Sequence, residues 1–457
     1  MRIYHVSFWI ALGVLTTGMV FGEMFKDGET VCFLGDSITN GGRYQNKIFD
    51  YYLTRFPGWT IRFINAGRSG DTAGGALSKR VKEDVIDVKP TSVAIMFGMN
   101  DVGRGNYVQN PTEKDLTAQQ RNLNGFKLNM EKLVKRIRDE ASDPKMFFMT
   151  PSPFDQTVVL DRDNNQPGCN DGLGRCGEIV RELAAKNGGR LIDFHGPMTA
   201  FNLAQQKKDP TYTLVGKDRV HPGAPGLMMM AWLFLKEQGV SPVVSRVALD
   251  AAAGRVTENV NAEVTQVEKK GNGISFTVLE KALPFPIDPG ASSMLALLPI
   301  EKDLNQEILS VTGLSAGTYE LQIDDIKVGT YTADDLKNGL SLGFNQATPQ
   351  YKQAQAVAKL NEQRRRAECR MHDLLNTRRW MKNHYKIDVD NPAAVQAHYD
   401  HFEDKTSHSA NMAKNYIQYW SNYDEFGKEM IRYEQELFAS RTLQPHAYAI
   451  MPLENTK

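Results

Sequence analysis

Short apolar runs recur through the first half of the chain, and each stops at glycine or at polar residues typical of turns. The runs that predict strands span residues 31–34, 61–64, 93–97, 146–149 and 190–194. Apolar residues at helical spacing predict helices at residues 44–56, 78–86, 123–140, 177–187 and 226–236. Strands that alternate with helices are typical of a parallel sheet, so this pattern predicts an α/β fold.

The residues after the first strand, Gly35, Asp36 and Ser37, place a serine at the mouth of a glycine-rich turn. Ligands of open α/β sheets collect beyond the carboxyl ends of the strands, which is where Ser37 is expected. A serine hydroxyl needs a base, and the base needs an acid that orients it. Asp218 precedes His221 by three residues, so one turn would let its carboxylate hold the imidazole while the imidazole faces Ser37.

Two more strand ends carry polar motifs. Gly70 lies in a Ser-Gly-Asp-Thr sequence after the second strand, and Asn100 lies in a Gly-Met-Asn-Asp sequence after the third. Together with Gly-Asp-Ser near the start and Asp-x-x-His-Pro late in the chain, these motifs resemble those of the SGNH hydrolase (GDSL esterase) family, in the same order. The resemblance covers roughly residues 28 to 238.

The resemblance implies a flavodoxin-like, three-layer α/β/α fold in which Ser37 attacks an ester carbonyl carbon. It further implies that His221 is the base, that Asp218 orients it, and that the oxyanion is bound by the backbone N–H groups of Ser37 and Gly70 and by the side chain of Asn100. The chain has no Gly-x-Ser-x-Gly elbow, which disfavours the α/β-hydrolase fold. Taken singly, the motifs have structural interpretations, with Ser37 as a helix N-cap and Asn100 in an Asx turn.

Three more residues are candidates for contact with the substrate. Asp36 adjoins the predicted nucleophile, and Phe154 and Asp155 follow the fourth strand in a Thr-Pro-Ser-Pro-Phe-Asp sequence. Residues past that strand line the mouth of the site in this topology. A proline-stiffened turn without contact to a ligand is the alternative for Phe154 and Asp155.

The composition changes after the hydrolase-like part of the chain, which we expect to span residues 23–242. Alternating short strands separated by turn signals predict a small β-sandwich at residues 243–345. Residues 346–457 carry apolar stripes at helical spacing, which predict a helical region that packs on the hydrolase domain. This arrangement resembles exported bacterial SGNH hydrolases that carry a sandwich module.

The first 22 residues have a short basic end and an apolar stretch, which predicts a secretory signal cleaved after Gly22. An uncleaved membrane anchor is the alternative; otherwise no membrane span is expected. In a secreted or periplasmic chain, Cys169 and Cys176, which we place in one loop, would form a disulfide. No cysteine or histidine spacing predicts a metal site, and no cofactor is expected.

Lys and Arg number 54, as do Asp and Glu, so the net charge is zero and a nucleic-acid partner is disfavoured. The expected partner is a small-molecule or polysaccharide ester. We therefore predict a secreted serine esterase, and the substrate class we favour makes it a carbohydrate O-acetylesterase. A lipid or aryl-ester acylhydrolase and a non-catalytic glycan-binding protein on a hydrolase scaffold are the alternatives.

Overall fold

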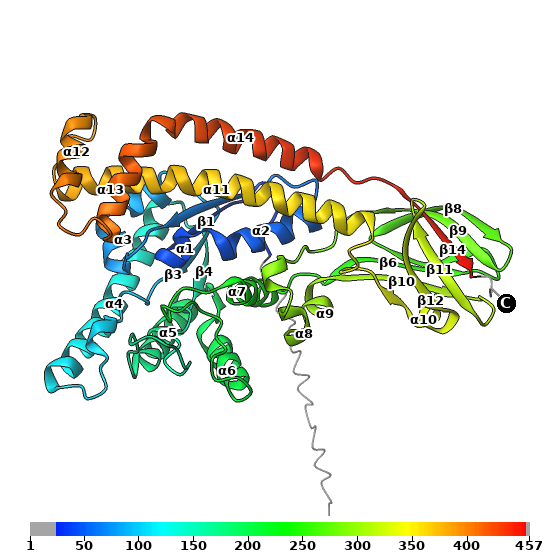
Figure 1. The fold of residues 1–457 in the computed structure, drawn as a ribbon, viewed down its shortest axis with the longest axis horizontal. Coiled ribbons are helices and arrows are strands. Elements are labelled where there is room, and N and C mark those ends of the chain that lie inside the picture. The colour runs from blue at the N-terminus through cyan, green and yellow to red at the C-terminus, as the bar shows by residue number, and fades with distance from the viewer. Residues whose placement is uncertain (1–23, 454–457) are drawn as a thin grey trace, which may run out of the picture.

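The computed structural model describes residues 24–453, so the predicted signal peptide lies outside the described residues. A five-stranded parallel sheet with the order β2-β1-β3-β4-β5 forms the centre of the larger lobe (Figure 1). Its strands are β1 (Thr30–Gly35), β2 (Arg62–Gly67), β3 (Ser92–Met96), β4 (Lys145–Met149) and β5 (Arg190–Ile192). This order is the flavodoxin-like one, and the predicted α/β fold is confirmed.

Helices cover both faces of this sheet. They are α1 (Ser37–Asn40), α2 (Arg43–Arg55), α3 (Ala73–Lys79), the π-helical turn η1 (Lys82–Ile86), the 3-10 turn η2 (Arg104–Asn106), α4 (Glu113–Glu140), α5 (Cys169–Lys186), α6 (His195–Gln206) and α7 (Ala224–Glu237). On one face, Phe33 and Phe63 of the sheet pack against Phe234 of α7 and Phe49 of α2. The other face is covered by η1, α3, α4 and α5. Both faces of the sheet can carry helices because successive side chains of a strand point to opposite faces.

Helices α4 and α5 begin eight or more residues earlier than their apolar pattern predicts. The Thr112 hydroxyl accepts a hydrogen bond from the Asp115 amide, and the Asp115 carboxylate accepts one from the Thr112 amide, so this capping box starts α4 about ten residues before the apolar stripe. Helix α5 starts at Cys169 rather than at residue 177.

The early start of α5 makes the predicted Cys169–Cys176 disulfide wrong. Seven residues along an α-helix span about 10.5 Å, whereas the Cα atoms of a disulfide lie within about 7 Å of each other. Both cysteines are buried and free. Burial raises the pKa of the Cys169 thiol to about 12.

The smaller lobe is a two-sheet β-sandwich. Its strands are β6 (Val243–Asp250), β7 (Arg255–Val260), β8 (Ala262–Lys270), β9 (Gly273–Glu280), β10 (Gln306–Thr312), β11 (Thr318–Ile323), β12 (Ile326–Thr332), β13 (Leu340–Ser341) and β14 (His446–Pro452). The sheets have the orders β13-β10-β6-β7 and β12-β11-β14-β9-β8. Short helices in this part of the chain are η3 (Pro289–Ala291), α8 (Met294–Leu297), α9 (Ile300–Leu304) and α10 (Ala333–Asn338).

Strand β14 lies between β11 and β9 and pairs with both in antiparallel fashion. It comes from the end of the chain, which the sequence pattern assigned to the helical region of residues 346–457. That prediction is therefore wrong for the last strand, because Tyr448 and Ile450 of β14 are buried in the core of the sandwich.

Between the sandwich strands β13 and β14 the chain returns to the larger lobe as helices. These are α11 (Pro349–His384), α12 (Pro392–Asp400), α13 (His408–Tyr419), the turn η4 (Trp420–Asn422) and α14 (Tyr423–Ser440). Helix α11 packs against α2 and α14, as Figure 1 shows. The buried Asn361 side chain of α11 donates a hydrogen bond to Asp50 of α2 at 2.7 Å.

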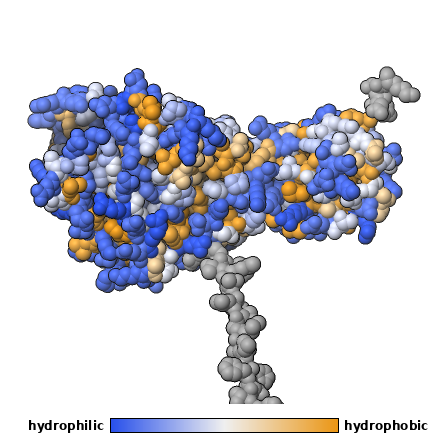
Figure 2. All heavy atoms as spheres, turned by 90° about the horizontal axis from the view of Figure 1, so that it is seen from below, coloured by the Kyte–Doolittle hydropathy of each residue, from blue (hydrophilic) through white to orange (hydrophobic). Residues whose placement is uncertain are grey.

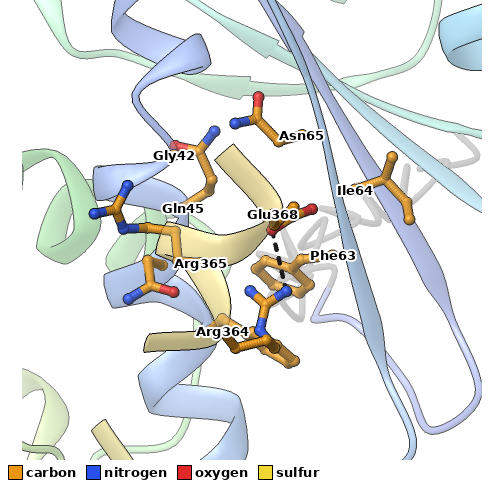
Figure 3. A pocket seen from close by; sticks show the side chains of 10 residues that line it. Gly42, Gln45, Phe63, Ile64, Asn65, Arg364, Arg365 and Glu368 are labelled. Atoms are coloured by element: carbon orange, nitrogen blue, oxygen red, sulfur yellow. Dashed lines mark hydrogen bonds and ion pairs between the residues drawn. The ribbon is translucent and has the colours of Figure 1, made fainter. Parts of the chain in front are cut away.

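The seam between α11 and the sheet is closely packed. Figure 3 shows Arg364 and Glu368 of α11, joined by an ion pair of 3.0 Å, beside Phe63 of β2. The space left between these elements is only about 10 Å³. The helical region is therefore a fixed part of the larger lobe, and Figure 2 shows this lobe and the sandwich joined at a narrower waist. No helix within residues 24–453 is long and apolar enough to cross a membrane.

Candidate active site

Ser37 lies at the carboxyl end of the central sheet, as its place after β1 predicts. It is the first residue of α1, and Asp36 is the N-cap of this helix, accepting a hydrogen bond from the Ile38 amide at 3.0 Å. The turn is tight: a Cβ atom on Gly35 would lie 2.7 Å from the Met96 carbonyl oxygen, and one on Gly67 would lie 2.1 Å from the Asn40 nitrogen. Glycine at both positions lets α1 sit directly on the ends of β1 and β2.

The structure joins the three residues predicted as nucleophile, base and orienting acid in one chain of hydrogen bonds. The Ser37 hydroxyl donates to Nε2 of His221 at 2.7 Å, although 184 residues separate them. Nδ1 of His221 donates to Oδ2 of Asp218 at 2.5 Å. This arrangement leaves Nε2 of the neutral imidazole as an acceptor for the serine proton.

The surroundings of the Asp218 carboxylate favour its ionised form. Burial alone would raise the pKa of Asp218, but hydrogen bonds from the His221 ring and from the amides of Val220 and His221 outweigh it, so the pKa lies below its usual value. Asp218 is therefore ionised at neutral pH. The side chains of Asp218 and His221 are 43% and 50% exposed, so the site is open to solvent.

The turn between Asp218 and His221 depends on Arg219, which the sequence reasoning missed. Arg219 has a φ of +65°, a left-handed conformation that side chains other than glycine rarely adopt. Its buried guanidinium donates to the carbonyl oxygens of Asp155 and Val158, both at 2.9 Å. These bonds hold the strained residue in place.

The predicted oxyanion donors lie on the loops that follow β2 and β3, the two strands on either side of β1. Gly70 has a φ of +74° and is exposed. One N–H of the Asn100 amide donates to the Asp71 carbonyl oxygen at 2.8 Å, which ties the two loops together. An amide NH₂ has two donors, so the other remains for a ligand.

Two residues that the sequence reasoning missed, the buried Arg80 and the partly buried Asp101, tie these loops to the sheet. The Arg80 guanidinium contacts the ends of β1 and β2 and pairs with Asp71 at 2.6 Å. The Asp101 carboxylate accepts hydrogen bonds from the amides of Ala73 at 2.9 Å and Gly98 at 3.1 Å. Burial raises the pKa of Asp101 to about 7, although the Ala73 hydrogen bond opposes the rise. No sequence motif marks Arg80.

The three predicted substrate contacts are wrong. Asp36 is 1% exposed and caps α1, Phe154 is 2% exposed in the core, and Asp155 is 3% exposed. The Asp155 carboxylate accepts hydrogen bonds from Thr213 at 2.7 Å and from Gln206 at 2.9 Å. These side chains point into the protein because the turn after β4 folds inward to contact the Arg219 segment, which the sequence pattern did not indicate.

No group of three or more histidine, cysteine or acidic side chains in the described part of the chain has a geometry that could hold a metal ion. His398 of α12 lies against the rings of Trp380 and Tyr385.

The likeness to known proteins now identifies the family. Residues 33–227 match the family described as GDSL-like Lipase/Acylhydrolase. An acetylxylan esterase of Geobacillus stearothermophilus is 30% identical in an alignment 236 residues long, which covers 48% of this chain and 98% of that protein. This chain belongs to the GDSL-like lipase/acylhydrolase family.

Solved structures are also similar to this GDSL-like hydrolase. A gut microbial diltiazem-metabolizing enzyme has a TM-score of 0.86 and 29% sequence identity, covering 95% of this chain and 99% of that one. The likeness to that enzyme therefore includes the sandwich and the C-terminal helices. The solved acetylxylan esterase from Geobacillus stearothermophilus has 27% identity and a TM-score of 0.37, with 47% of this chain and 96% of that chain covered.

Proposed function

We propose that this GDSL-like hydrolase is a serine esterase that removes acetyl groups from carbohydrate esters. The observation that carries the proposal is the chain of hydrogen bonds from Ser37 through His221 to Asp218, of 2.7 and 2.5 Å. Such a chain converts a weakly nucleophilic hydroxyl into one that attacks a carbonyl carbon, because the imidazole takes the proton as the bond forms.

In the first step, Ser37 Oγ attacks the ester carbonyl carbon and its proton passes to Nε2 of His221. The ionised Asp218 stabilises the imidazolium that forms. The negative charge on the tetrahedral intermediate is bound by the amides of Ser37 and Gly70 and by the second N–H of Asn100. Loss of one such donor lowers turnover on the order of a hundredfold or more.

The imidazolium then gives its proton to the departing alcohol, which leaves an acyl-serine. Water, deprotonated by His221, attacks the acyl carbon. The bond from this carbon to Ser37 Oγ then breaks, Oγ takes the proton back from the imidazolium, and the acid is released. Each proton is therefore taken and returned by the same nitrogen. All groups needed for both steps are side chains or amides of this chain.

Two observations favour an acetylated carbohydrate as the substrate. The relative that matches residues of the hydrolase lobe is an acetylxylan esterase, and the half-exposed His221 lies in an open site that a polysaccharide can reach. The basic and apolar N-terminal sequence supports export, which would bring the enzyme to such substrates.

The test is hydrolysis of p-nitrophenyl acetate, butyrate and octanoate by the chain from Glu23 onward, followed by release of acetate from acetylated xylan. Ser37→Ala should abolish both activities and labelling by a fluorophosphonate. Ser78→Ala, which changes an exposed serine of α3, is the matched control and should retain them. Rates that rise with chain length would instead favour a lipid or aryl-ester acylhydrolase.

A further inference from the structure

A cavity of about 590 Å³ lies between the C-terminal helices and the carboxyl edge of the hydrolase sheet. Asn40, Arg68 and Ser69 form its hydrolase wall, and residues of α11, α13 and α14 form the rest. Figure 1 shows α13 at the end of the larger lobe where α1 and α3 lie. None of the residues assigned above to the ester chemistry lines this cavity.

The cavity nevertheless borders those residues. Asn40 ends the short helix that Ser37 begins, so their Cα atoms are about 4.5 Å apart along the helix axis. Ser69 directly precedes Gly70. A ligand whose ester lies at Ser37 can therefore extend into the cavity with its alcohol part.

The walls of the cavity are fixed to each other. The Asn40 side chain donates to Oδ1 of Asp373 at 3.0 Å, and Nε2 of His372 donates to the Gly67 carbonyl oxygen at 2.8 Å. The two bonds join α11 to the last residue of α1 and to the last residue of β2. A preformed cavity loses little ordering entropy when a ligand enters.

Two donors in the walls lack partners. Asn376 of α11 is 6% exposed, and within residues 24–453 its Nδ2 has no hydrogen-bond partner. The half-buried guanidinium of Arg68 forms no ion pair or hydrogen bond with any described residue. A buried donor is costly to leave unpaired, so Asn376 favours a ligand that offers an acceptor oxygen. Arg68 adds a partly exposed positive charge to the same wall, which favours a ligand that carries a negative charge.

The remaining lining suits a sugar ring. Trp380, Tyr419 and Phe426 present aromatic rings, and Asn411 and Asn415 add side-chain amides. The apolar face of a pyranose can pack on such rings while its hydroxyls hydrogen-bond with the amides. A guanidinium binds a carboxylate through two parallel hydrogen bonds, which a hydroxyl cannot match.

We propose that this cavity binds the alcohol part of the substrate as an acidic oligosaccharide, with Arg68 on a uronic-acid carboxylate and Asn376 on a neighbouring oxygen. This inference deepens the proposed esterase function and rests on it for the position of the ester. The C-terminal helices would then supply the specificity for the sugar, while the hydrolase domain supplies the chemistry.

The experiment measures binding rather than turnover. Trigalacturonate and, as the neutral comparison, xylotriose are titrated calorimetrically into the full chain carrying Ser37→Ala. We expect trigalacturonate to bind and xylotriose to bind at least tenfold more weakly. Adding Arg68→Gln should weaken trigalacturonate binding about tenfold or more, because a charge-assisted pair is lost.

A second variant and a control complete the test. Asn376→Asp replaces a donor with a negative charge of the same shape and should abolish trigalacturonate binding through repulsion. Arg432→Gln removes the same charge as Arg68→Gln from α14, where the side chain is 56% exposed and pairs with Glu436, and should leave binding unchanged.

Three results would overturn the inference. Trigalacturonate could fail to bind, xylotriose could bind equally well, or the Arg68→Gln variant could bind as well as its parent. Failure of the proposed esterase function would be detected separately, because the assay with p-nitrophenyl acetate does not involve a sugar. A chain that binds trigalacturonate but hydrolyses no ester would retain this site and lose the proposed function.

Discussion

Nη2 of Arg80 donates a hydrogen bond to the carbonyl oxygen of Gly35, the last residue of β1, at 2.9 Å. Its Nη1 donates to the carbonyl oxygen of Ala66 near the end of β2 at 2.6 Å. One buried side chain therefore holds together the strand that delivers Ser37 and the strand that leads to Gly70. The ion pairs of Arg80 with Asp71 and Asp84 compensate its charge.

We predict that Arg80→Lys lowers kcat for p-nitrophenyl acetate at least tenfold while the chain stays folded. Lysine keeps a positive charge beside the two acids, but its single ammonium group cannot reproduce the planar fork of donors to both strand ends. The nucleophile and the Gly70 loop should then lose their relative position. Circular dichroism and steady-state kinetics measure fold and turnover.

The matched control is Arg246→Lys, on an exposed arginine of β6 in the sandwich, which should keep full activity. A kcat for Arg80→Lys equal to that of the natural chain would show that Arg80 does not position the site.

Asp218→Asn should reduce kcat on the order of a thousandfold or more, because a neutral amide neither stabilises the imidazolium nor selects the His221 tautomer that accepts the serine proton. Fluorophosphonate labelling of Ser37 should slow in parallel. Asp209→Asn alters an exposed acid in the same segment and should change neither rate. Labelling that proceeds at the original rate would exclude this role for Asp218.

Glu307 makes stability depend on pH. It is 2% exposed, and among the described residues neither of its carboxylate oxygens has a hydrogen-bond partner. Burial raises the pKa of Glu307 to about 8, nearby Glu280 adds to the rise, and Arg55 opposes it. The folded chain therefore keeps this proton at pH values where the unfolded chain has lost it, so stability falls as the pH rises from about 5 to 8.

Glu307→Gln should remove this loss, because the amide does not ionise. The unfolding free energy of the variant relative to the natural chain should rise by up to about 1.4 kcal/mol per pH unit across that window. Urea denaturation at pH 5, 6, 7 and 8 measures the difference, with the exposed Glu258→Gln as control. A difference that does not change with pH would contradict the prediction.

Deletion of residues 445–457 should unfold the sandwich, because it removes β14 from the middle of a five-stranded sheet. Both β11 and β9 would lose their hydrogen-bonded partner, and the core would lose the buried Tyr448 and Ile450. Deletion of residues 454–457 alone is the control and should leave the melting temperature unchanged. Equal melting temperatures for the two deletions would show that β14 adds nothing to the sandwich.

Features with a local signal could be predicted from the sequence. Short, mostly apolar segments of four or five residues located all five strands of the hydrolase sheet, because a strand covered on both faces has few polar positions. The residues that end these strands meet at one edge whatever packs around the sheet. Ser37, Gly70 and Asn100 could therefore be assigned to that edge from the sequence, as could the neighbouring Asp218 and His221.

The direction of individual side chains was less predictable. Phe154 and Asp155 follow a strand end as the other candidates do, yet both are buried because the turn after β4 contacts Arg219. A position after a strand indicates where the backbone lies. Whether the side chain faces solvent depends on what the rest of the chain places against it.

Local sequence patterns were enough to predict the α/β fold, the order of the motifs and the presence of a sandwich, because periodicity and turn residues act within a few positions. Three features emerge only from long-range packing: β14 completes the sandwich, Arg80 joins two strand ends, and α11 forms a cavity wall near Ser37. These features depend on contacts between residues as far apart as Asn40 and Asp373, 333 positions along the chain. No local pattern encodes such contacts, because they exist only once separate elements have packed together.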